Sequence, residues 1–361
     1  MLHVEGGAHL YGGALQVLYL LEGLATAGVT NYLVCRRGAE LGDRAASFAQ
    51  VHAMSMGGDL DVALVGRLVR LIRGLRPDLV HLHSRIGADV MGGIAGRLAG
   101  VPIVHTRRVD NPELRLLVAL KYRLHDRVIA ISQGIAEVLR AEGLPDRKLR
   151  VVRSAVVADR FSRPCEAGLI SGRLGLPEDS VVLGVAAQLI ERKGHAVLLR
   201  ALSDLLDQEP RLQVIFLGQG PLRADLQRQI AAAGWLSRVH LAGFRNDLAE
   251  ILPCLTLLVH PALMEGLGVS LLQASAAGVA IVSTRVGGIP EAVEDGVTGV
   301  LVPPGDPIAL GGAIRRLLED DVLRTRLGQA GAARVRRLFS VDGMVSGNLD
   351  VYRELLEVGR S

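Results

Sequence analysis

Short apolar runs rich in β-branched residues alternate with longer amphipathic segments along most of this chain. In the first half the runs that we predict as strands are LHVE, NYLVC, DLVHLHS, PIVHT, RVIAIS and KLRVVRSAV. The segments between them carry apolar residues at helical spacing, as in residues 14–27. Parallel strands need long crossover connections, so this alternation predicts a parallel sheet covered by helices.

The alternation lapses over residues 158–180, which are rich in Gly, Pro, Ser and charged residues, and we place a domain boundary near residue 168. A second series then begins, with the predicted strands VVLGVAAQ, LQVIFLGQG, RVHLAGF, LTLLVHP, VAIVST and GVLVPP. We therefore expect an α/β chain of two doubly wound parallel-sheet domains, residues 1–167 and 168–340, facing an interdomain cleft. Residues 341–361 are expected to form a helix that packs back across the junction, because Leu349, Tyr352, Leu355 and Leu356 form an apolar stripe.

The composition agrees with two domains and excludes some functions. A chain of 361 residues exceeds the usual length of one domain, and nearly half of its residues are hydrophobic. Residues 1–160 carry 21 Lys and Arg against 15 Asp and Glu, a net +6 that would favour an anionic substrate or membrane surface. Aromatic residues are only 3% of the chain, so the stacking side chains of a nucleic-acid module are almost absent and no nucleic-acid partner is expected.

The cysteines and the apolar runs bear on location. The three cysteines are far apart and odd in number, with no zinc-ligand spacing, so a reducing cytosol is the simplest setting. The first residues show no signal-peptide pattern, and no apolar run reaches the roughly 18 residues that a spanning helix needs. We expect a cytoplasmic protein, with any contact at the inner face of the membrane being peripheral.

The stretch HPALMEGLGVSLLQASAAG, residues 260–278, is the most informative for function. It follows a predicted buried strand, turns through Glu265, Gly266 and Gly268, and then begins a helix. The free N–H groups at a helix start suit a phosphate, whereas a carboxylate would repel one. Both requirements are met by a ligand with a phosphate and a hydroxyl-rich group, such as a nucleotide sugar, and Gln273 could then reach ribose hydroxyls. A capping carboxylate and a helix-edge glutamine remain an equal alternative.

Four further segments follow predicted strands or precede helices. Lys193, in ERKG, stands between a strand and a helix and could bind a diphosphate, although lysine is common at such positions. Gly218 and Gly220 would let the backbone approach a ligand or would simply form a tight turn. Gly12 and Gly13 precede a helix without the GxGxxG spacing of a nicotinamide-binding turn. In LAGFRNDLAEIL we expect Asn246 or Asp247 to cap a helix, with the backbone around Arg245 near a nucleobase.

In their order and spacing, these motifs resemble the retaining glycosyltransferases of the GT-B fold, specifically family four, which use nucleotide sugars. The likeness runs nearly end to end, through GGA, DLVHLHS, VIAISQGIAEVL, ERKG, GQGP, HLAGF, HPALMEGLGVSLLQ and GGIPEAV. The resemblance implies that Glu265 contacts the donor sugar, that Lys193 binds the diphosphate and that the turn at Gly12 and Gly13 closes over it. The backbone amides from Gly266 through Leu267 and Gly268 to Val269 would hold the distal phosphate.

The chain departs from the family pattern at three positions. Gln273 stands where the family usually has a glutamate that holds the ribose. Gln188 stands where an arginine usually helps to bind the diphosphate, and Arg192 could compensate. Arg108 occupies the place of a histidine near the reacting centre, with Arg107 and Asp110 close by; the alternative for these three is a solvated basic loop.

We therefore expect an enzyme, a hexosyl-type glycosyltransferase that moves a sugar from a nucleoside diphosphate to an acceptor hydroxyl with retained anomeric configuration. The acceptor would be a glycan or glycolipid, as in bacterial lipopolysaccharide or surface polysaccharide synthesis. Glu265, Lys193 and Arg108 are the predicted catalytic residues. Two alternatives are a nucleotide-sugar epimerase or hydrolase of the same fold, and a non-catalytic nucleotide-sugar-binding protein.

No cofactor and no metal are expected. Asp59 and Asp61 form an Asp-x-Asp pattern, but they precede a helical segment of the first domain, where capping explains them better. We expect His81 and His83 to face opposite sides of one strand and to be structural rather than metal ligands.

Overall fold

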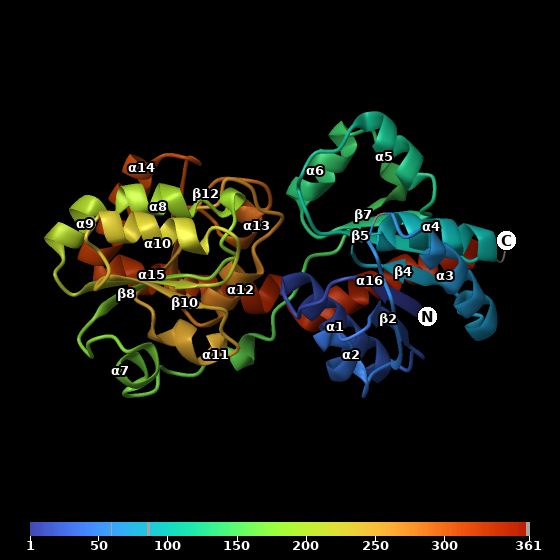
Figure 1. Cartoon of the computed structure of the whole chain (residues 1–361), viewed down its shortest axis with the longest axis horizontal. Coiled ribbons are helices and arrows are strands. Elements are labelled where there is room, and N and C mark those ends of the chain that lie inside the picture. Colours follow the sequence, from blue (N-terminus) through green and yellow to red (C-terminus); the bar gives the residue numbers. More distant parts are fainter. Residues whose placement is uncertain (59, 85–86, 359–361) are drawn as a thin grey trace. The chain divides into compact units, whose positions relative to one another are not determined.

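The computed structural model describes residues 1–58, 60–84 and 87–358, which form two compact units (Figure 1). The N-terminal unit holds Met1–Ala155 together with the C-terminal helix α16 (Val341–Val358), and the C-terminal unit holds Val156–Ser340. The chain leaves the first unit before the expected residue 168, because the N–H of Val156 already donates to the carbonyl oxygen of Phe339 at 2.9 Å.

The N-terminal unit is a parallel sheet in the order β3-β2-β1-β4-β5-β6-β7. Its strands are β1 (Leu2–Glu5), β2 (Tyr32–Arg36), β3 (Gln50–Met54), β4 (Val80–Leu82), β5 (Ile103–Arg107), β6 (Arg127–Ala130) and β7 (Leu149–Val151). Its other helices are α1 (Gly12–Thr26), α2 (Glu40–Ala45), α3 (Val62–Leu75), α4 (Ala88–Ala99), α5 (Arg115–Tyr122), α6 (Gln133–Ala141) and the short η1 (Asp146–Lys148). The edge strand β3 was not predicted, since none of its side chains is fully buried.

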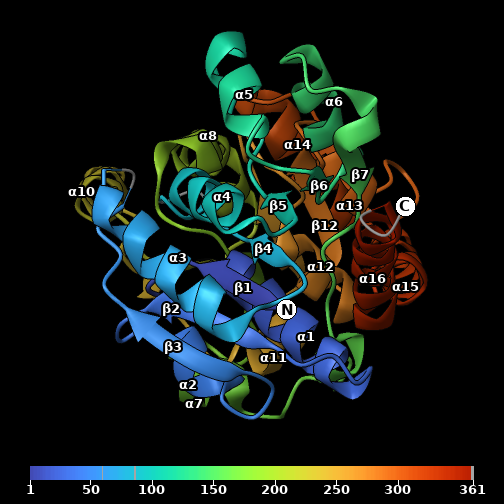
Figure 2. The same cartoon turned by 90° about the vertical axis from the view of Figure 1, so that its right-hand side faces the viewer.

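The alternation of side chains along these strands builds two helical layers. Leu2, Val4 and Val80 pack with α3 and α4 on one face of the sheet. Val104 and Ile129 pack on the other face, where α1 and α16 lie side by side (Figure 2). Helix α16 therefore belongs to the core of the first unit although it is the last element of the chain.

The C-terminal unit is a second parallel sheet, in the order β10-β9-β8-β11-β12-β13. Its strands are β8 (Val181–Val185), β9 (Leu212–Leu217), β10 (Val239–Gly243), β11 (Leu257–His260), β12 (Ala280–Thr284) and β13 (Val300–Val302). Its helices are η2 (Ala158–Arg160), α7 (Leu169–Leu174), η3 (Glu191–Lys193), α8 (His195–Ala201), α9 (Ser203–Gln208), α10 (Arg223–Ala232), α11 (Leu248–Ile251), η4 (Leu252–Cys254), α12 (Val269–Ala276), α13 (Ile289–Ala292), α14 (Pro307–Glu319) and α15 (Asp321–Leu338). All six strands were predicted, because each is a nearly continuous apolar run.

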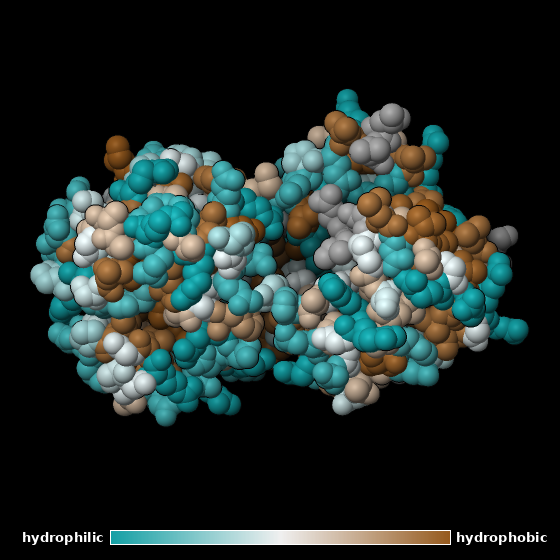
Figure 3. All heavy atoms as spheres, viewed as in Figure 1, coloured by the Kyte–Doolittle hydropathy of each residue, from teal (hydrophilic) through white to brown (hydrophobic). Residues whose placement is uncertain are grey.

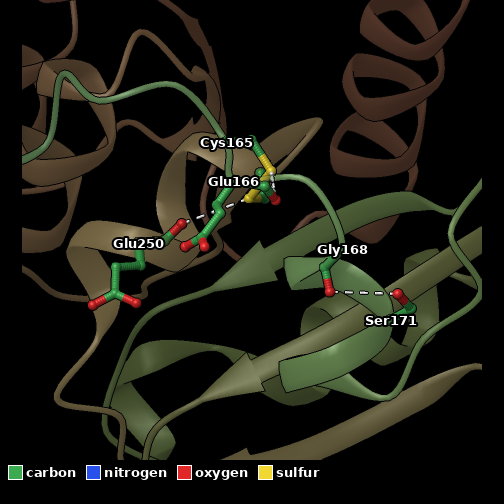
Figure 4. The surroundings of a disulfide bond; sticks show 6 residues. Cys165, Glu166, Gly168, Ser171 and Glu250 are labelled. Atoms are coloured by element: carbon green, nitrogen blue, oxygen red, sulfur yellow. Dashed lines mark hydrogen bonds between the residues drawn. A yellow bond between two sulfur atoms is a disulfide. The ribbon is translucent and has the colours of Figure 1, made fainter.

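A disulfide joins Cys165 to Cys254 in this unit, with their Cα atoms 4.8 Å apart (Figure 4). It connects the segment before α7 to η4 across 89 residues of sequence. This pairing was not predicted from the sequence, and it removes the ground on which a reducing setting was expected. Cys35 is a buried free thiol.

None of the helices in the described ranges is long and apolar enough to cross a bilayer.

Candidate active site

The strand order of the C-terminal unit reverses between β8 and β11. From β8 the chain runs outward through β9 and β10, and after returning at β11 it runs the other way through β12 and β13. In sheets of this kind, ligands bind beyond the carboxyl ends of the strands that flank such a reversal. Lys193 follows β8 and Glu265 follows β11, and their side chains form an ion pair at this point. The structure thus brings together the two residues that the sequence analysis placed at separate strand ends.

The backbone at Gly194 explains why the two loops can meet. Gly194 has a φ of +69°, a left-handed conformation that side chains disfavour, and a Cβ atom there would lie 1.9 Å from the carbonyl oxygen of Pro261. The carbonyl oxygen of Arg192 accepts a hydrogen bond from the N–H of Leu263 at 2.8 Å. The loop that carries Lys193 therefore lies directly against the loop that carries Glu265, backbone on backbone.

The carboxylate of Glu265 has two donors on the same oxygen. Its Oε2 accepts from Nζ of Lys193 and from Nε2 of His260, the latter at 2.8 Å. Burial alone would raise the pKa of Glu265, but the hydrogen bond from His260 and the charge of Lys193 outweigh it and hold that pKa well below its ordinary value. Burial in turn lowers the pKa of His260, although Glu265 opposes this shift. Glu265 is thus ionised and His260 neutral at ordinary pH.

Helix α12 begins beside this pair. Gly268, with a φ of +87°, is its N-cap and has no side-chain cap. The backbone N–H groups of Gly268, Val269 and Ser270 find no acceptor among the residues that the structure describes. A helix start with open amides is a favourable place for an anion. Gln273 lies further along the same helix and is half-buried.

The two glycines after β9 have a packing role. A Cβ at Gly218 would lie 1.9 Å from the carbonyl oxygen of Ala187, and one at Gly220 would lie 2.4 Å from that of Leu189. These glycines let the loop after β9 approach the loop after β8, whereas the sequence analysis had offered a ligand or a tight turn as their reason.

The other residues predicted to contact the nucleotide-sugar donor are more exposed to solvent than Lys193. Gln188 is exposed and Arg192 is half-buried. Arg245 makes a two-point ion pair with Asp247, at 2.6 and 2.8 Å. Asp247 is the N-cap residue of α11, as expected, but its side chain does not bond to the helix because it is taken by Arg245.

The N-terminal unit has its own reversal, between β1 and β4. Glu5 ends β1, and its Oε1 accepts from the N–H of Gly7 at 2.8 Å. Arg108 follows β5 and lies next to the start of α1, since a Cβ at Gly13 would be 3.4 Å from its Cδ. Burial raises the pKa of Glu5, although Gly7 and Arg108 oppose the shift, and burial lowers the pKa of Arg108 to about 10. The glycine-rich turn at Gly12 and Gly13 and the predicted Arg108 are therefore neighbours.

Arg107 points away from this group and is not solvated, contrary to the alternative of a solvated basic loop. Its guanidinium is fully buried, pairs with Glu113 and donates to the backbone oxygen of Val109 at 2.8 Å. It also approaches Glu142 at 3.9 Å. Arg107 thus fixes the loop after β5 and is not available to a substrate. Asp110 is buried in the same loop.

The expectation that His81 and His83 face opposite sides of their strand is wrong. Residues two apart on a strand share a face, and the two rings lie 3.8 Å apart, beside His3. The three imidazoles are close enough to be considered as metal ligands. Both nitrogens of His81 are already hydrogen-bonded, to the hydroxyls of Tyr352 and Thr106 at 2.7 Å each, so this cluster is a buried polar network.

Asp61 caps α3, as expected, by accepting from the N–H of Leu64 at 3.1 Å. It also pairs with Arg67 at 2.5 Å. Asp59, the other acid of that pattern, lies outside the described residues.

Both halves of the chain match glycosyltransferase families. Residues 11–160 match the family described as Glycosyltransferase Family 4, and residues 169–334 match Glycosyl transferases group 1. The chain is 32% identical to a D-inositol 3-phosphate glycosyltransferase of Streptomyces avermitilis over 318 residues, 80% of this chain and 68% of that protein. It is 30% identical to a 2-deoxystreptamine glucosyltransferase of Streptomyces kanamyceticus, over 72% of each chain.

The chain belongs to the GT4-type glycosyltransferases. Its fold is GT-B, because it superposes on Anabaena Alr3699/HepE, solved in complex with UDP and glucose, with a TM-score of 0.87 over 97% of this chain and 98% of that one. Sequence identity in that superposition is 21%. The predicted fold class and the family resemblance are therefore confirmed.

Two polar side chains beside predicted site residues of this glycosyltransferase were missed from sequence: one contacts Glu265, and the other interacts electrostatically with Arg108. His260 is the last residue of β11 and was counted only as part of a strand. Glu5 ends β1 and was counted likewise. Each is a polar residue at the carboxyl end of a strand beside the reversal, and that position is the signal that would have found both.

Proposed function

We propose that this glycosyltransferase moves a sugar from a nucleoside diphosphate sugar to an acceptor hydroxyl, with retention of anomeric configuration. The observation that carries the proposal is the contact between Lys193 and ionised Glu265 beside the open amides of α12. One cation with aligned N–H groups suits a diphosphate, and an anion held next to it suits sugar hydroxyls.

Leaving-group stabilisation is the main demand of the reaction, because negative charge develops on the distal phosphate as the glycosidic bond breaks. Lys193 and the amides from Gly266 to Val269 would stabilise that charge in the transition state. Glu265 would orient the sugar. The acceptor would attack from the face of the leaving phosphate, which takes the acceptor's proton. Arg108, beside the Gly13 turn, would contact the donor or the acceptor from the N-terminal unit.

The remaining donor contacts are proposed on position. Gln273 on α12 would hold the ribose, and Gln188 and Arg192 would extend the diphosphate site beside Lys193. The loop of Gly218 and Gly220 and the loop of Arg245 would face the nucleobase side. The reaction needs no metal in this proposal, because the positive charge comes from Lys193 and backbone dipoles. Turnover unchanged by a chelator supports this, and turnover restored only by a divalent cation contradicts it.

The donor is proposed to be a hexose nucleotide. In support, the relative from Streptomyces kanamyceticus is named a glucosyltransferase, and the structure of Alr3699/HepE contains UDP and glucose. The acceptor is proposed to be a glycan or glycolipid of bacterial lipopolysaccharide or surface polysaccharide synthesis, used at the inner face of the membrane.

A peripheral membrane contact through α5 fits this acceptor. Leu114 and Leu120 at its two ends are 74% and 63% exposed, and Arg115 and Arg123 are exposed beside them. Hydrophobic residues also gather over α4 on the face of the N-terminal unit shown in Figure 3. Exposed leucines with arginines favour an anionic lipid surface. Co-sedimentation with anionic vesicles should be lost in the double variant Leu114→Glu/Leu120→Glu. It should be kept in Leu236→Glu, a control in the C-terminal unit. Equal sedimentation of the wild type, the double variant and the control contradicts the contact.

The test of the reaction uses purified protein and a panel of nucleoside diphosphate sugars. We expect release of nucleoside diphosphate from one donor in the presence of acceptor, with the activity lost in both Glu265→Ala and Lys193→Ala. Arg200→Ala, an exposed cation on α8, is the matched control. Free sugar or an epimerised donor as product would favour a hydrolase or epimerase. Donor binding without any turnover would favour a non-catalytic binding protein.

A further inference from the structure

His260 occupies a fixed place at the centre of the C-terminal sheet. It ends β11, one of the two strands at the reversal, and its side chain is 2% exposed. Its carbonyl oxygen accepts from the hydroxyl of Ser283 on the neighbouring β12 at 2.8 Å. The backbone that carries the imidazole is therefore held by the neighbouring strand β12, and the buried ring has little freedom to move.

The two oxygens of the Glu265 carboxylate have different surroundings. Its Oε2 receives the hydrogen bonds of both His260 and Lys193. Its Oε1 receives none from the described part of the chain, and it is not among the buried atoms that lack a partner. One oxygen is thus anchored to the protein while the other is open to a ligand.

We propose that His260 is a positioning residue, which holds Oε2 of Glu265 so that Oε1 faces the sugar hydroxyls of the donor. The proposal rests on the proposed function. There Lys193 must also serve the diphosphate, so it cannot be the sole anchor of Glu265. His260 is buried behind the carboxylate and keeps its orientation when the lysine engages the phosphate.

A neutral hydrogen-bond donor suits the task of orienting Glu265 better than a second cation would. The groups that face His260 are Glu265, Lys193 and His195, and the ring stays uncharged among them because it is buried. Its Nε2–H orients the carboxylate and leaves the negative charge of Glu265 available to polarise hydroxyl groups. The proton is placed on Nε2 because that nitrogen faces an ionised oxygen.

Three substitutions separate this role from packing. His260→Gln places an amide N–H near the position of Nε2, His260→Asn places one near Nδ1, and His260→Leu removes both. We expect His260→Asn and His260→Leu to weaken donor binding about 10- to 100-fold, the range for losing a hydrogen bond to a charged group, and His260→Gln to retain most of it. The affinity for the nucleoside diphosphate alone should change by less than about threefold, because that ligand has no sugar for Glu265 to contact.

The measurement is calorimetric affinity for the intact donor and for its nucleoside diphosphate, without acceptor. His240→Leu is the matched control, since His240 also donates from Nε2 to a side-chain oxygen, Oε1 of Gln213 at 2.8 Å, but on β10. In a Glu265→Ala background, His260→Leu should have no further effect on donor affinity. The unfolding temperature of each variant reports whether it is folded.

Two results would overturn the role of His260: a His260→Gln variant as weak as His260→Leu, or a His260→Leu loss that persists in the Glu265→Ala background. An equal loss of affinity for donor and nucleoside diphosphate in a folded His260→Leu protein also contradicts it, because that pattern indicates general distortion. Failure of the proposed function looks different, since Glu265→Ala itself would then leave donor affinity unchanged.

Discussion

Each unit has one acid at the end of a strand beside its reversal and one cation near it, but the two pairs differ in their electrostatics. In the C-terminal unit Glu265 contacts Lys193 and His260 directly, and its pKa is held low. In the N-terminal unit Glu5 accepts a hydrogen bond from the amide of Gly7 and interacts with Arg108 only electrostatically. Burial therefore dominates and raises the pKa of Glu5. The anion of Glu265 is therefore stabilised by its surroundings, whereas the anion of Glu5 is destabilised by burial. This difference supports our proposal that Glu265 contacts the ligand, whereas Glu5 has a structural role.

The largest expected effect is on catalysis. Glu265→Gln should lower kcat/KM for the donor about 100- to 1000-fold, the size found when one preorganised polar group is lost from a transition state. Glu5→Gln should lower it less than about tenfold, because Oε1 of Glu5 is taken by Gly7 and the amide of glutamine can still accept that bond. Steady-state kinetics of both variants decide the comparison. Losses of equal size would mean that the two acids have similar roles.

The next effect is on stability. Gly194→Ala should lower the free energy of unfolding by about 3 kcal/mol or more, because it adds a left-handed alanine and an overlap with the Pro261 carbonyl. Gly278→Ala is the matched control: its φ is +72°, but a Cβ there meets nothing within 4 Å, so the cost should be about 1 kcal/mol. Urea unfolding measures both. Equal costs would show that the two loops separate easily and that the contact does not hold Lys193 in place.

The two acids should also give opposite pH dependence of stability. The lowered pKa of Glu265 contributes stability that is present above its unfolded pKa of about 4.3 and is lost as the pH falls. The raised pKa of Glu5 contributes stability that is complete below its unfolded pKa and is lost as the pH rises through the folded pKa. Relative to wild type, Glu265→Gln should therefore be most destabilised near pH 7, whereas Glu5→Gln should gain stability as the pH rises. Unfolding in urea from pH 3.5 to 7.5 tests this, and parallel curves would refute it.

The sequence predicted the sheets well because buried parallel strands are continuous apolar runs bounded by turns. It failed at β3, an edge strand with the sequence QVHAM. None of its residues is fully buried, so no continuous apolar run indicates the strand. Lys193 and Glu265 were predicted separately, since glycines and strand ends are local features. Their contact depends on the order β8-β11, which only the folded sheet defines.

Two of the remaining misses have the same origin in long-range contacts, and a third is a misread local spacing. The disulfide joins residues 89 apart, and no local pattern indicates that η4 lies beside the segment before α7. The contact of His260 with Glu265 depends on the direction of one side chain, and the position of His260 five residues before Glu265 does not reveal it. His81 and His83 were wrongly assigned to opposite faces although their spacing of two places them together.

The smallest expected effect concerns the attachment of α16 to the N-terminal unit. This unit, unlike the C-terminal one, includes the last helix of the chain in its core. The hydroxyl of Tyr352 on α16 bonds to Nδ1 of buried His81 at 2.7 Å. Tyr352→Phe should lower the free energy of unfolding by about 1 kcal/mol, because it leaves an imidazole nitrogen without its partner. Tyr32→Phe on β2 is the control and should cost less, since no hydrogen bond of its hydroxyl is found among the described residues. If both substitutions cost the same, packing of α16 on α1 is sufficient, and the histidine network does not select this helix.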